Sequence, residues 1–209
     1  TNNSPDELKF LWVQLDQNMR APNSKSPLIE KGGVTLKPSA FAKTYMKNVF
    51  KRGFNIEKVL DVNGKGLEYM INGTMMRIEL PNTMKTGDQF SFDIQWWYNI
   101  NNHVEEGGRS GYEYFADTDN KIYVMAQFYP RMAVYNDVEG WQNAQFFGRD
   151  EFALPFGDFE VDITVPADHI LDGTGELVNR KEVFTKKMME QYKKAQSSYN
   201  EPVVIVSQQ

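Results

Sequence analysis

The chain has 209 residues, 41% of them hydrophobic and 13% aromatic, and this length fits one domain or one domain with a short appendage. The aromatic content excludes wholesale disorder, and the absence of cysteine excludes a disulfide scaffold, a thiol nucleophile and Cys-ligated zinc or iron–sulfur sites. A net charge of −5 argues against a general nucleic-acid-binding protein, and no apolar run is long enough to span a membrane.

The N-terminal part begins with a turn at residues 2–6 and a compact apolar run at residues 8–15, which predicts a strand. Residues 21–38 are rich in Pro, Ser, Lys and Gly, a composition typical of an exposed loop. Apolar residues then recur every fourth position between residues 39 and 52, which predicts a short helix.

Two Asn-Gly pairs, Asn63-Gly64 and Asn72-Gly73, separate alternating apolar segments. Asn-Gly supplies the two residues of positive φ that a tight hairpin turn needs. The pattern therefore predicts a three-stranded meander, in which Pro81 ends the last strand because proline cannot donate a backbone hydrogen bond. The three strands are expected at residues 56–62, 66–71 and 74–80.

The clearest alternation of apolar and polar residues covers residues 90–100 and predicts a half-buried strand. Further strands are expected at residues 122–129 and 159–165, each followed by a proline. Up to residue 178 we therefore predict one all-β domain of antiparallel strands, either a sandwich or an open curved sheet.

The C-terminal residues 179–209 have a different pattern, which predicts a helical linker and then a connecting strand at residues 203–206. Asn179 is a suitable helix cap with Glu182 three residues later, and Ser197 ends the helical pattern. The apolar residues at helical spacing are Phe184, Met188, Tyr192 and Ala195.

Candidates for chemistry are sparse when the residues are considered alone. The two histidines, His103 and His169, lie far apart in sequence and each in an expected loop, which does not fit a zinc site. The segment Arg109-Ser110-Gly111 lacks the pattern of a phosphate-binding loop and is interpreted as a flexible hairpin loop. The residues thus point to no catalytic set and no metal ligands.

Two alternatives stay open at this point. A hydrolase needs only two well-placed carboxylates, although such acidic clusters usually form a solvated face; the candidates are Asp137, Glu139, Asp150 and Glu151. A binding module could instead present Trp97 and Trp141 to glycans or to a protein partner, since exposed aromatic rings on a β domain can stack on sugars.

Four segments stand out: Asn2–Asn18 with Asn-Asn-Ser-Pro-Asp, residues 123–141 from Tyr123 to Trp141, residues 148–166 from Gly148 to Pro166, and Gly173-Thr-Gly-Glu-Leu177. Together they resemble the N-terminal β domain of zinc aminopeptidases, in the aminopeptidase N and leukotriene hydrolase family and particularly its large bacterial branch. Residues 21–52 match weakly and are interpreted as an insertion.

The resemblance implies a longer parent enzyme whose zinc lies in a separate catalytic domain. That domain carries His-Glu-x-x-His for zinc and Gly-x-Met-Glu-Asn for the substrate amino terminus, and neither motif occurs in this chain. We therefore expect residues 1–178 to be a β domain that lacks its first strands, with residues 179–209 leading towards the catalytic domain. The expected partners are that domain and, through it, a peptide substrate.

One residue role is implied by the resemblance. In the family, a Gln just before a short Pro-containing motif reaches the active-site cleft, and Gln127 occupies that position in Ala-Gln-Phe-Tyr-Pro. The expected strand would place Gln127 on one face with Tyr123, Met125 and Tyr129; the alternative is a structural hydrogen bond to a neighbouring strand. The loop 131–147 would face the catalytic domain, and bacterial relatives of this branch are often exported to the periplasm or cell envelope.

Overall fold

A computed structural model of the chain describes residues 1–25, 38, 52–148 and 153–207. Contacts divide the chain into two compact units, Thr1–Asp158 and Phe159–Gln209. Strands predominate in the first unit, all strand pairs are antiparallel, and the second unit contains the C-terminal helices. The all-β prediction with a C-terminal helix is confirmed at this level.

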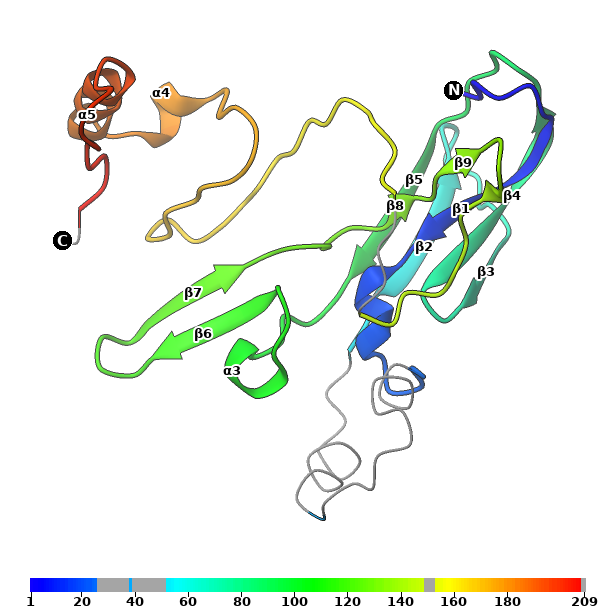
Figure 1. Cartoon of the computed structure of the whole chain (residues 1–209), viewed down its shortest axis with the longest axis horizontal. Helices are drawn as coiled ribbons and strands as arrows, with labels where there is room; N and C mark the ends of the chain where they lie inside the picture. Colours follow the sequence, from blue (N-terminus) through cyan, green and yellow to red (C-terminus); the bar gives the residue numbers. More distant parts are fainter. Residues whose placement is uncertain (26–37, 39–51, 149–152, 208–209) are drawn as a thin grey trace. The chain divides into compact units, whose positions relative to one another are not determined.

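The main sheet of the first unit is built around the predicted N-terminal strand, β1 (Leu8–Gln14). It has four strands in the order β3–β4–β1–β8, and Figure 1 shows β1 beside β4. Leu11 and Val13 of β1 are buried, and the register places Leu11 opposite Ile78 and Val13 opposite Met76 on the inner face. The other strands are β3 (Tyr69–Asn72), β4 (Met75–Met84) and β8 (Arg131–Met132).

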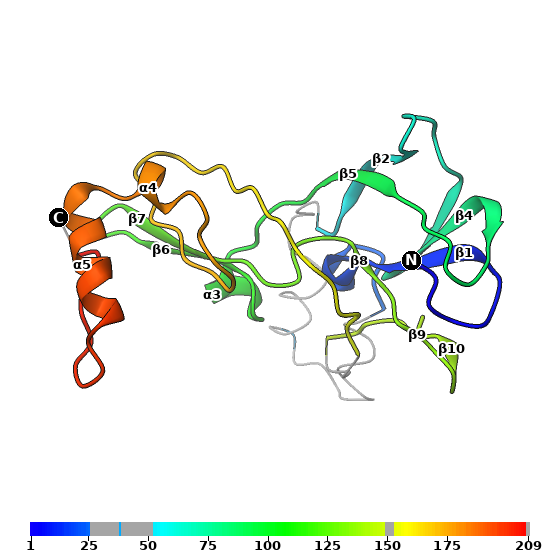
Figure 2. The same ribbon diagram turned by 90° about the horizontal axis from the view of Figure 1, so that it is seen from above.

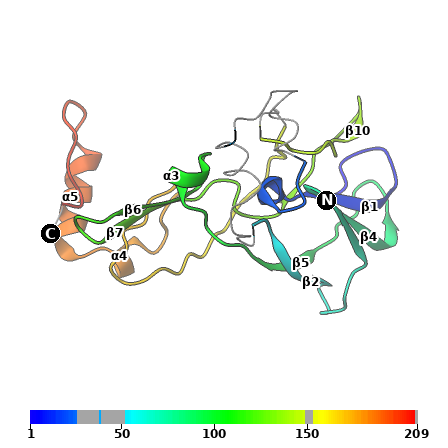
Figure 3. The ribbon, with the colours of Figure 1, turned by 90° about the horizontal axis from the view of Figure 1, so that it is seen from below.

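A second antiparallel pair, β2 (Asn55–Asp61) and β5 (Phe92–Trp97), contributes to the same core, and Figure 3 shows these two strands side by side. The alternation predicted for residues 90–100 is confirmed, since every second residue of β5 packs against the buried cluster. The buried cluster consists of Val13, Leu15, Phe54, Val59, Leu67, Met76 and Ile78.

The predicted meander is only partly correct. The hairpin between β3 and β4 forms as expected, but its two turn residues are Gly73 and Thr74. Asn72 still pairs with Met75 at the end of β3, and of the Asn72-Gly73 pair only Gly73 has a positive φ, of 56°. The strand β2, however, pairs along its length with β5. It meets the next segment through the isolated bridge Leu60–Gly66 and a few backbone hydrogen bonds around it, such as that from the Leu67 amide to the Val59 carbonyl at 2.9 Å. The prediction that Pro81 ends the third strand is wrong, because β4 continues to Met84 across an irregularity in its register with β1 that accommodates the proline.

A separate two-stranded ribbon follows, formed by β6 (Gly111–Phe115) and β7 (Asn120–Val124), as Figure 2 shows. A short helix, α3 (His103–Glu106), precedes it. The strand predicted at residues 122–129 is wrong in its second half, since β7 ends at Val124. Residues 135–141 form a small hairpin of β9 (Tyr135–Asn136) and β10 (Gly140–Trp141).

The second unit contains α4 (Arg180–Val183) and α5 (Lys186–Gln196). The helical pattern predicted after Asn179 is therefore interrupted at Phe184, and Thr185 caps α5 by accepting a hydrogen bond from the Met188 amide. Phe184, predicted to share a helical face with Tyr192, lies outside both helices, although its ring meets that of Tyr192 edge to face with centroids 6.0 Å apart.

The strands predicted at residues 159–165 and 203–206 are wrong: both segments are described, and neither forms a strand. The alternating apolar side chains of residues 159–165 remain exposed, with Phe159 at 68% and Val161 at 55%. Alternation describes two faces of a strand, but a strand also needs a neighbouring chain to satisfy its backbone groups.

The helix predicted within residues 39–52 and most of the loop predicted at residues 21–38 lie outside the described residues. The domain boundary predicted after residue 178 stays a prediction. Among the residues that the structure describes, no helix is both long and apolar enough to cross a membrane.

Candidate functional site around Gln127

Gln127 lies beyond the end of β7 and not on a strand face with Tyr123, Met125 and Tyr129, so that part of the prediction is wrong. Its backbone is in the left-handed region, with a φ of 52°. This conformation is unfavourable for a residue with a Cβ atom, because the Cβ approaches the following carbonyl oxygen. The side chain is half-buried, and the bend at Gln127 ends the sheet before Pro130.

The left-handed bend is held by hydrogen bonds from three other segments of the first unit. The Gln17 amide donates from Nε2 to the carbonyl oxygens of Ala126, at 3.2 Å, and Gln127, at 3.0 Å. The Ser110 hydroxyl accepts from the Ala126 amide at 2.7 Å and donates to the Ala126 carbonyl at 2.6 Å. The Trp96 indole donates to the Phe128 carbonyl at 3.3 Å. We call residues 126–128, which these hydrogen bonds hold in place, the clamped segment.

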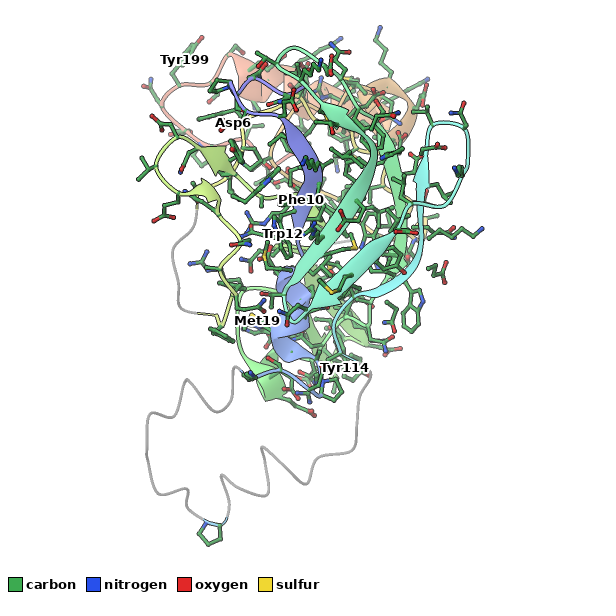
Figure 4. The ribbon with its side chains drawn as sticks, turned by 90° about the vertical axis from the view of Figure 1, so that its right-hand side faces the viewer. Asp6, Phe10, Trp12, Met19, Tyr114 and Tyr199 are labelled. Atoms are coloured by element: carbon green, nitrogen blue, oxygen red, sulfur yellow. The ribbon has the colours of Figure 1, made fainter. Side chains whose placement is uncertain are left out.

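Gln17 belongs to a short 3-10 helix, η1 (Asp16–Arg20), which follows β1 directly. Figure 4 shows Met19 on this helix, with Trp12 and Phe10 further back along β1. The first three residues of η1, namely Asp16, Gln17 and Asn18, are polar and yet buried. We call these three residues the η1 polar cluster.

Each member of the η1 polar cluster binds a different part of the chain. The Asp16 carboxylate accepts two hydrogen bonds from Arg131, from Nε at 2.7 Å and from Nη2 at 3.1 Å. The Asn18 amide donates to the Gly73 carbonyl at 2.9 Å and accepts from the Phe54 amide at 2.8 Å. The cluster thereby ties β8, the β3–β4 turn and the start of β2 to one point.

The Asp16–Arg131 pair is the most buried ion pair of the described residues, with the two side chains 1% and 7% exposed. Removing two charges from water is costly, and the bidentate geometry is what compensates for it. Arg131 begins β8 only a few residues after Gln127, so this pair fixes the C-terminal side of the bend.

Tyr98 forms one side of the same region. Its ring meets Phe54 edge to face with centroids 5.4 Å apart, and its hydroxyl lies 3.9 Å from the Met125 sulfur. Burial raises the pKa of Tyr98 to about 12, and the charge of Arg20 opposes the rise. The hydroxyl is therefore neutral at physiological pH and contributes no anionic group near the bend.

The chemistry available at the bend is that of an amide. Gln127 offers two N–H donors and a carbonyl acceptor without charge, which suits the recognition of peptide groups. The surrounding groups supply rigidity, because a binding side chain must be held by packing and hydrogen bonds to be effective. An amide of this kind can bind and orient a polar ligand.

The other sequence candidates are not gathered at this site. His103 is exposed at the start of α3, which corrects its placement in a loop. His169 belongs to the second unit, where its ring nitrogen lies 2.9 Å from the Asp168 carboxylate; that bond lowers the pKa of Asp168. Within the described part of the chain, no three His, Asp or Glu side chains are grouped as metal ligands, so these residues do not fit a zinc site.

The acidic candidates form a solvated turn where they are described. Asp137 and Glu139 are both exposed between β9 and β10, while Asp150 and Glu151 lie outside the described residues. Asn136 organises the turn, accepting hydrogen bonds from the Val138 and Glu139 amides. A pair of exposed carboxylates in a turn lacks the enclosed geometry of an acid–base pair.

The two tryptophans considered for glycan binding lie in different sheets. Trp97 is 41% exposed on β5. Trp141 is in β10 instead of a loop, and its ring packs edge to face on Tyr135 with centroids 5.2 Å apart. The tyrosine hydroxyl in turn bonds the Asp6 carboxylate at 2.6 Å, which raises the pKa of Tyr135.

Sequence reasoning missed the groups that support Gln127. Ser110 was assigned to a flexible loop, yet it is 4% exposed and binds both backbone groups of Ala126. Gln17 received no role, although a polar triplet immediately after an apolar strand is a signal that could have marked it. Its partner lies more than one hundred residues away in sequence, and only the folded chain brings the two together.

Two surface hollows lie elsewhere, and neither includes Gln127. One of about 390 Å³ lies in the second unit between α5 and the C-terminal residues, where Lys187, Lys194 and Val203 line it. The other, of about 210 Å³, lies beside Pro81 and Phe90. Neither hollow is lined by Gln127, so the support for this site comes from the hydrogen bonds at the bend.

Comparison of the chain with protein-family models, with curated proteins and with solved structures finds no significant match.

Proposed function

We propose that this chain is the non-catalytic N-terminal β domain of a zinc-dependent aminopeptidase, in which Gln127 contacts the peptide substrate. Its strands form part of a curved sheet or sandwich that walls the active-site cleft. The zinc and the groups that break the bond belong to a catalytic domain outside this chain. The parent enzyme would remove N-terminal residues from peptides.

The observation that carries the proposal is the left-handed backbone of Gln127. Residues held in unfavourable conformations cluster at binding sites, where the surrounding structure compensates for the strain. A glycine would occupy the same bend with less strain. The presence of a glutamine, with a polar amide at its end, supports a role for the side chain itself.

The hydrogen bonds of the clamped segment give further support. Gln17, Ser110 and Trp96 approach it from three different elements, and each binds backbone groups, which leaves the Gln127 side chain available for a ligand. The sequence resemblance places a substrate-contacting Gln at this position. The physical reason and the resemblance therefore point to the same residue.

The test begins with the reading frame that encodes this chain. We expect His-Glu-x-x-His beyond Gln209 and hydrolysis of amino-acid p-nitroanilides by the full-length zinc-loaded protein, with none by the 209-residue chain. Gln127→Ala in the full-length protein should raise KM about tenfold with kcat changed less than twofold, because a ground-state hydrogen bond to substrate is lost.

The matched control is Gln95→Ala, which removes an exposed amide from β5, in a different sheet. It should leave both kinetic constants unchanged. A reading frame without the zinc motif, or a full-length protein that hydrolyses no N-terminal residue, would overturn the proposal. Equal effects of the two substitutions would remove Gln127 from the substrate site.

A second candidate function is a glycan-binding module, and the exposed ring of Trp97 favours it. Titration of the chain with a glycan array, comparing it with Trp97→Ala, tests this directly. Binding that is lost with Trp97 would support the module, and absence of binding would reject it.

A further inference from the structure

We propose that Gln17 is a positioning residue for Gln127: it holds the backbone bend that directs the Gln127 amide towards a peptide group of the substrate. The substrate part of this inference rests on the proposed function. The positioning part rests only on the contacts within the first unit.

Gln17 is well placed for this role because its side chain is inflexible. It is 4% exposed, it belongs to a 3-10 helix, and its two neighbours in the η1 polar cluster are themselves fixed by hydrogen bonds. A buried amide of this kind has few rotamers available, so its direction is set before any ligand binds.

The two hydrogen bonds that Gln17 donates are unusual because their acceptors are the carbonyl oxygens of two adjacent residues. One Nε2 atom reaches two consecutive carbonyl oxygens, those of Ala126 and Gln127. Consecutive carbonyls point in opposite directions along a strand, but the left-handed φ of Gln127 turns both towards the same donor. The donor therefore stabilises the bend specifically and would not bind both groups if the segment were extended.

Gln14 provides a matched control within the same stretch of chain. It is the same residue type and equally buried at 4%, and its Oε1 atom has no hydrogen-bond partner among the described residues. Substituting methionine, which has a similar shape, removes the amide at either position. Only Gln17→Met removes a donor from the clamped segment.

The first experiment uses the 209-residue chain and nuclear magnetic resonance of its backbone amides. Gln17→Met should shift or broaden the signals of residues 126–128, whereas Gln14→Met should leave them within a line width. If Gln17→Met prevents folding, Ser110→Ala loosens the same segment from the other side. Unchanged signals of residues 126–128 in the folded Gln17→Met or Ser110→Ala variant would overturn the positioning role.

The second experiment is a double-mutant cycle in the full-length enzyme. Gln17→Met should raise KM several-fold with little change in kcat, and it should add nothing once Gln127 is alanine, because a positioning residue acts only through its target. An effect of Gln17→Met that persists in the Gln127→Ala background would show a merely structural role. A full-length protein without aminopeptidase activity would end the proposed function and the substrate part with it, while the resonance experiment still decides whether Gln17 holds the bend.

Discussion

Two antiparallel strand pairs in the first unit are both rich in apolar residues but have very different surroundings. In the β1–β4 pair, Leu11 faces Ile78 and Val13 faces Met76, and all four side chains are buried. In the β6–β7 pair, Tyr112 faces Tyr123, and all five residues of β7 are exposed. Apolar content is therefore a poor guide to which pair contributes to stability.

The difference lies in what covers each pair. The β1–β4 pair is flanked by β3 and β8 and packs against β2 and β5 through the buried cluster. The η1 polar cluster then ties its end to Arg131, Gly73 and Phe54. Among the described residues, β6 and β7 pair only with each other, and an isolated two-stranded ribbon contributes little stability on its own. Four changes test this comparison.

The largest effect is expected from Arg131→Met. It leaves the Asp16 carboxylate buried without its partner, which should lower the free energy of unfolding by about 3–5 kcal/mol in urea denaturation. The control is Arg77→Met, which breaks the more exposed pair with Glu79 and should cost about 1 kcal/mol or less. Equal costs would mean that the η1 polar cluster does not stabilise the β1–β4 region.

The next effect compares two isoleucines directly. Ile78→Ala should lower the free energy of unfolding by about 2–5 kcal/mol, because it opens a cavity in the buried cluster. Ile122→Ala on β7 removes a side chain that is already 56% exposed and should change stability by about 0.5 kcal/mol or less. A large cost at Ile122 would show that β7 is covered in solution and would break the comparison.

A smaller effect depends on pH. The pKa of Tyr98 is raised from 10.0 to about 12, so the folded state favours the neutral hydroxyl; its contribution is complete below pH 10 and is lost as the pH rises from 10 to 12. Tyr98→Phe should abolish this loss, which we expect to be roughly 1–2 kcal/mol after allowance for solvent screening. Chemical denaturation at pH 9 and pH 12 measures it. Tyr69→Phe on β3, where the ring is exposed, should keep the full alkaline loss.

The smallest expected effect is an increase in stability. Gln127→Gly relieves the left-handed strain and should raise the free energy of unfolding by about 0.5–1 kcal/mol. Gln127→Ala retains the strain and serves as the control in the same denaturation experiment. If glycine and alanine give the same stability, the bend is not strained, and the main support for a functional side chain is lost.

The sequence predictions are accurate for strands with a buried face and fail for a segment that remains exposed. The strand at residues 8–15 was predicted from a compact apolar run, and the strand at residues 90–100 from alternation, which burial of one face imposes. Residues 159–165 alternate just as clearly and form no strand, because the pattern does not say whether a neighbouring strand is present. Pro81 was expected to end β4, but the strand continues past it through a local irregularity in its register with β1.

Of the candidate site, the sequence identified Gln127 but not the residues that hold it in place. Gln127 was identified through a resemblance, whereas its left-handed bend could not be anticipated from a segment that was expected to be extended. Gln17 and Ser110 reach the bend from positions distant in sequence, and a single chain without its fold gives no measure of such distances.

The sequence by itself determined which segments can be strands or helices, since local periodicity and turn residues such as Gly73 are properties of neighbouring positions. Only the tertiary structure decided which of those strands acquired partners and how Gln17, Ser110 and Trp96 converge on Gln127. Pairing and convergence depend on the free energy of burying distant groups together, and that quantity is not contained in any local stretch of the chain.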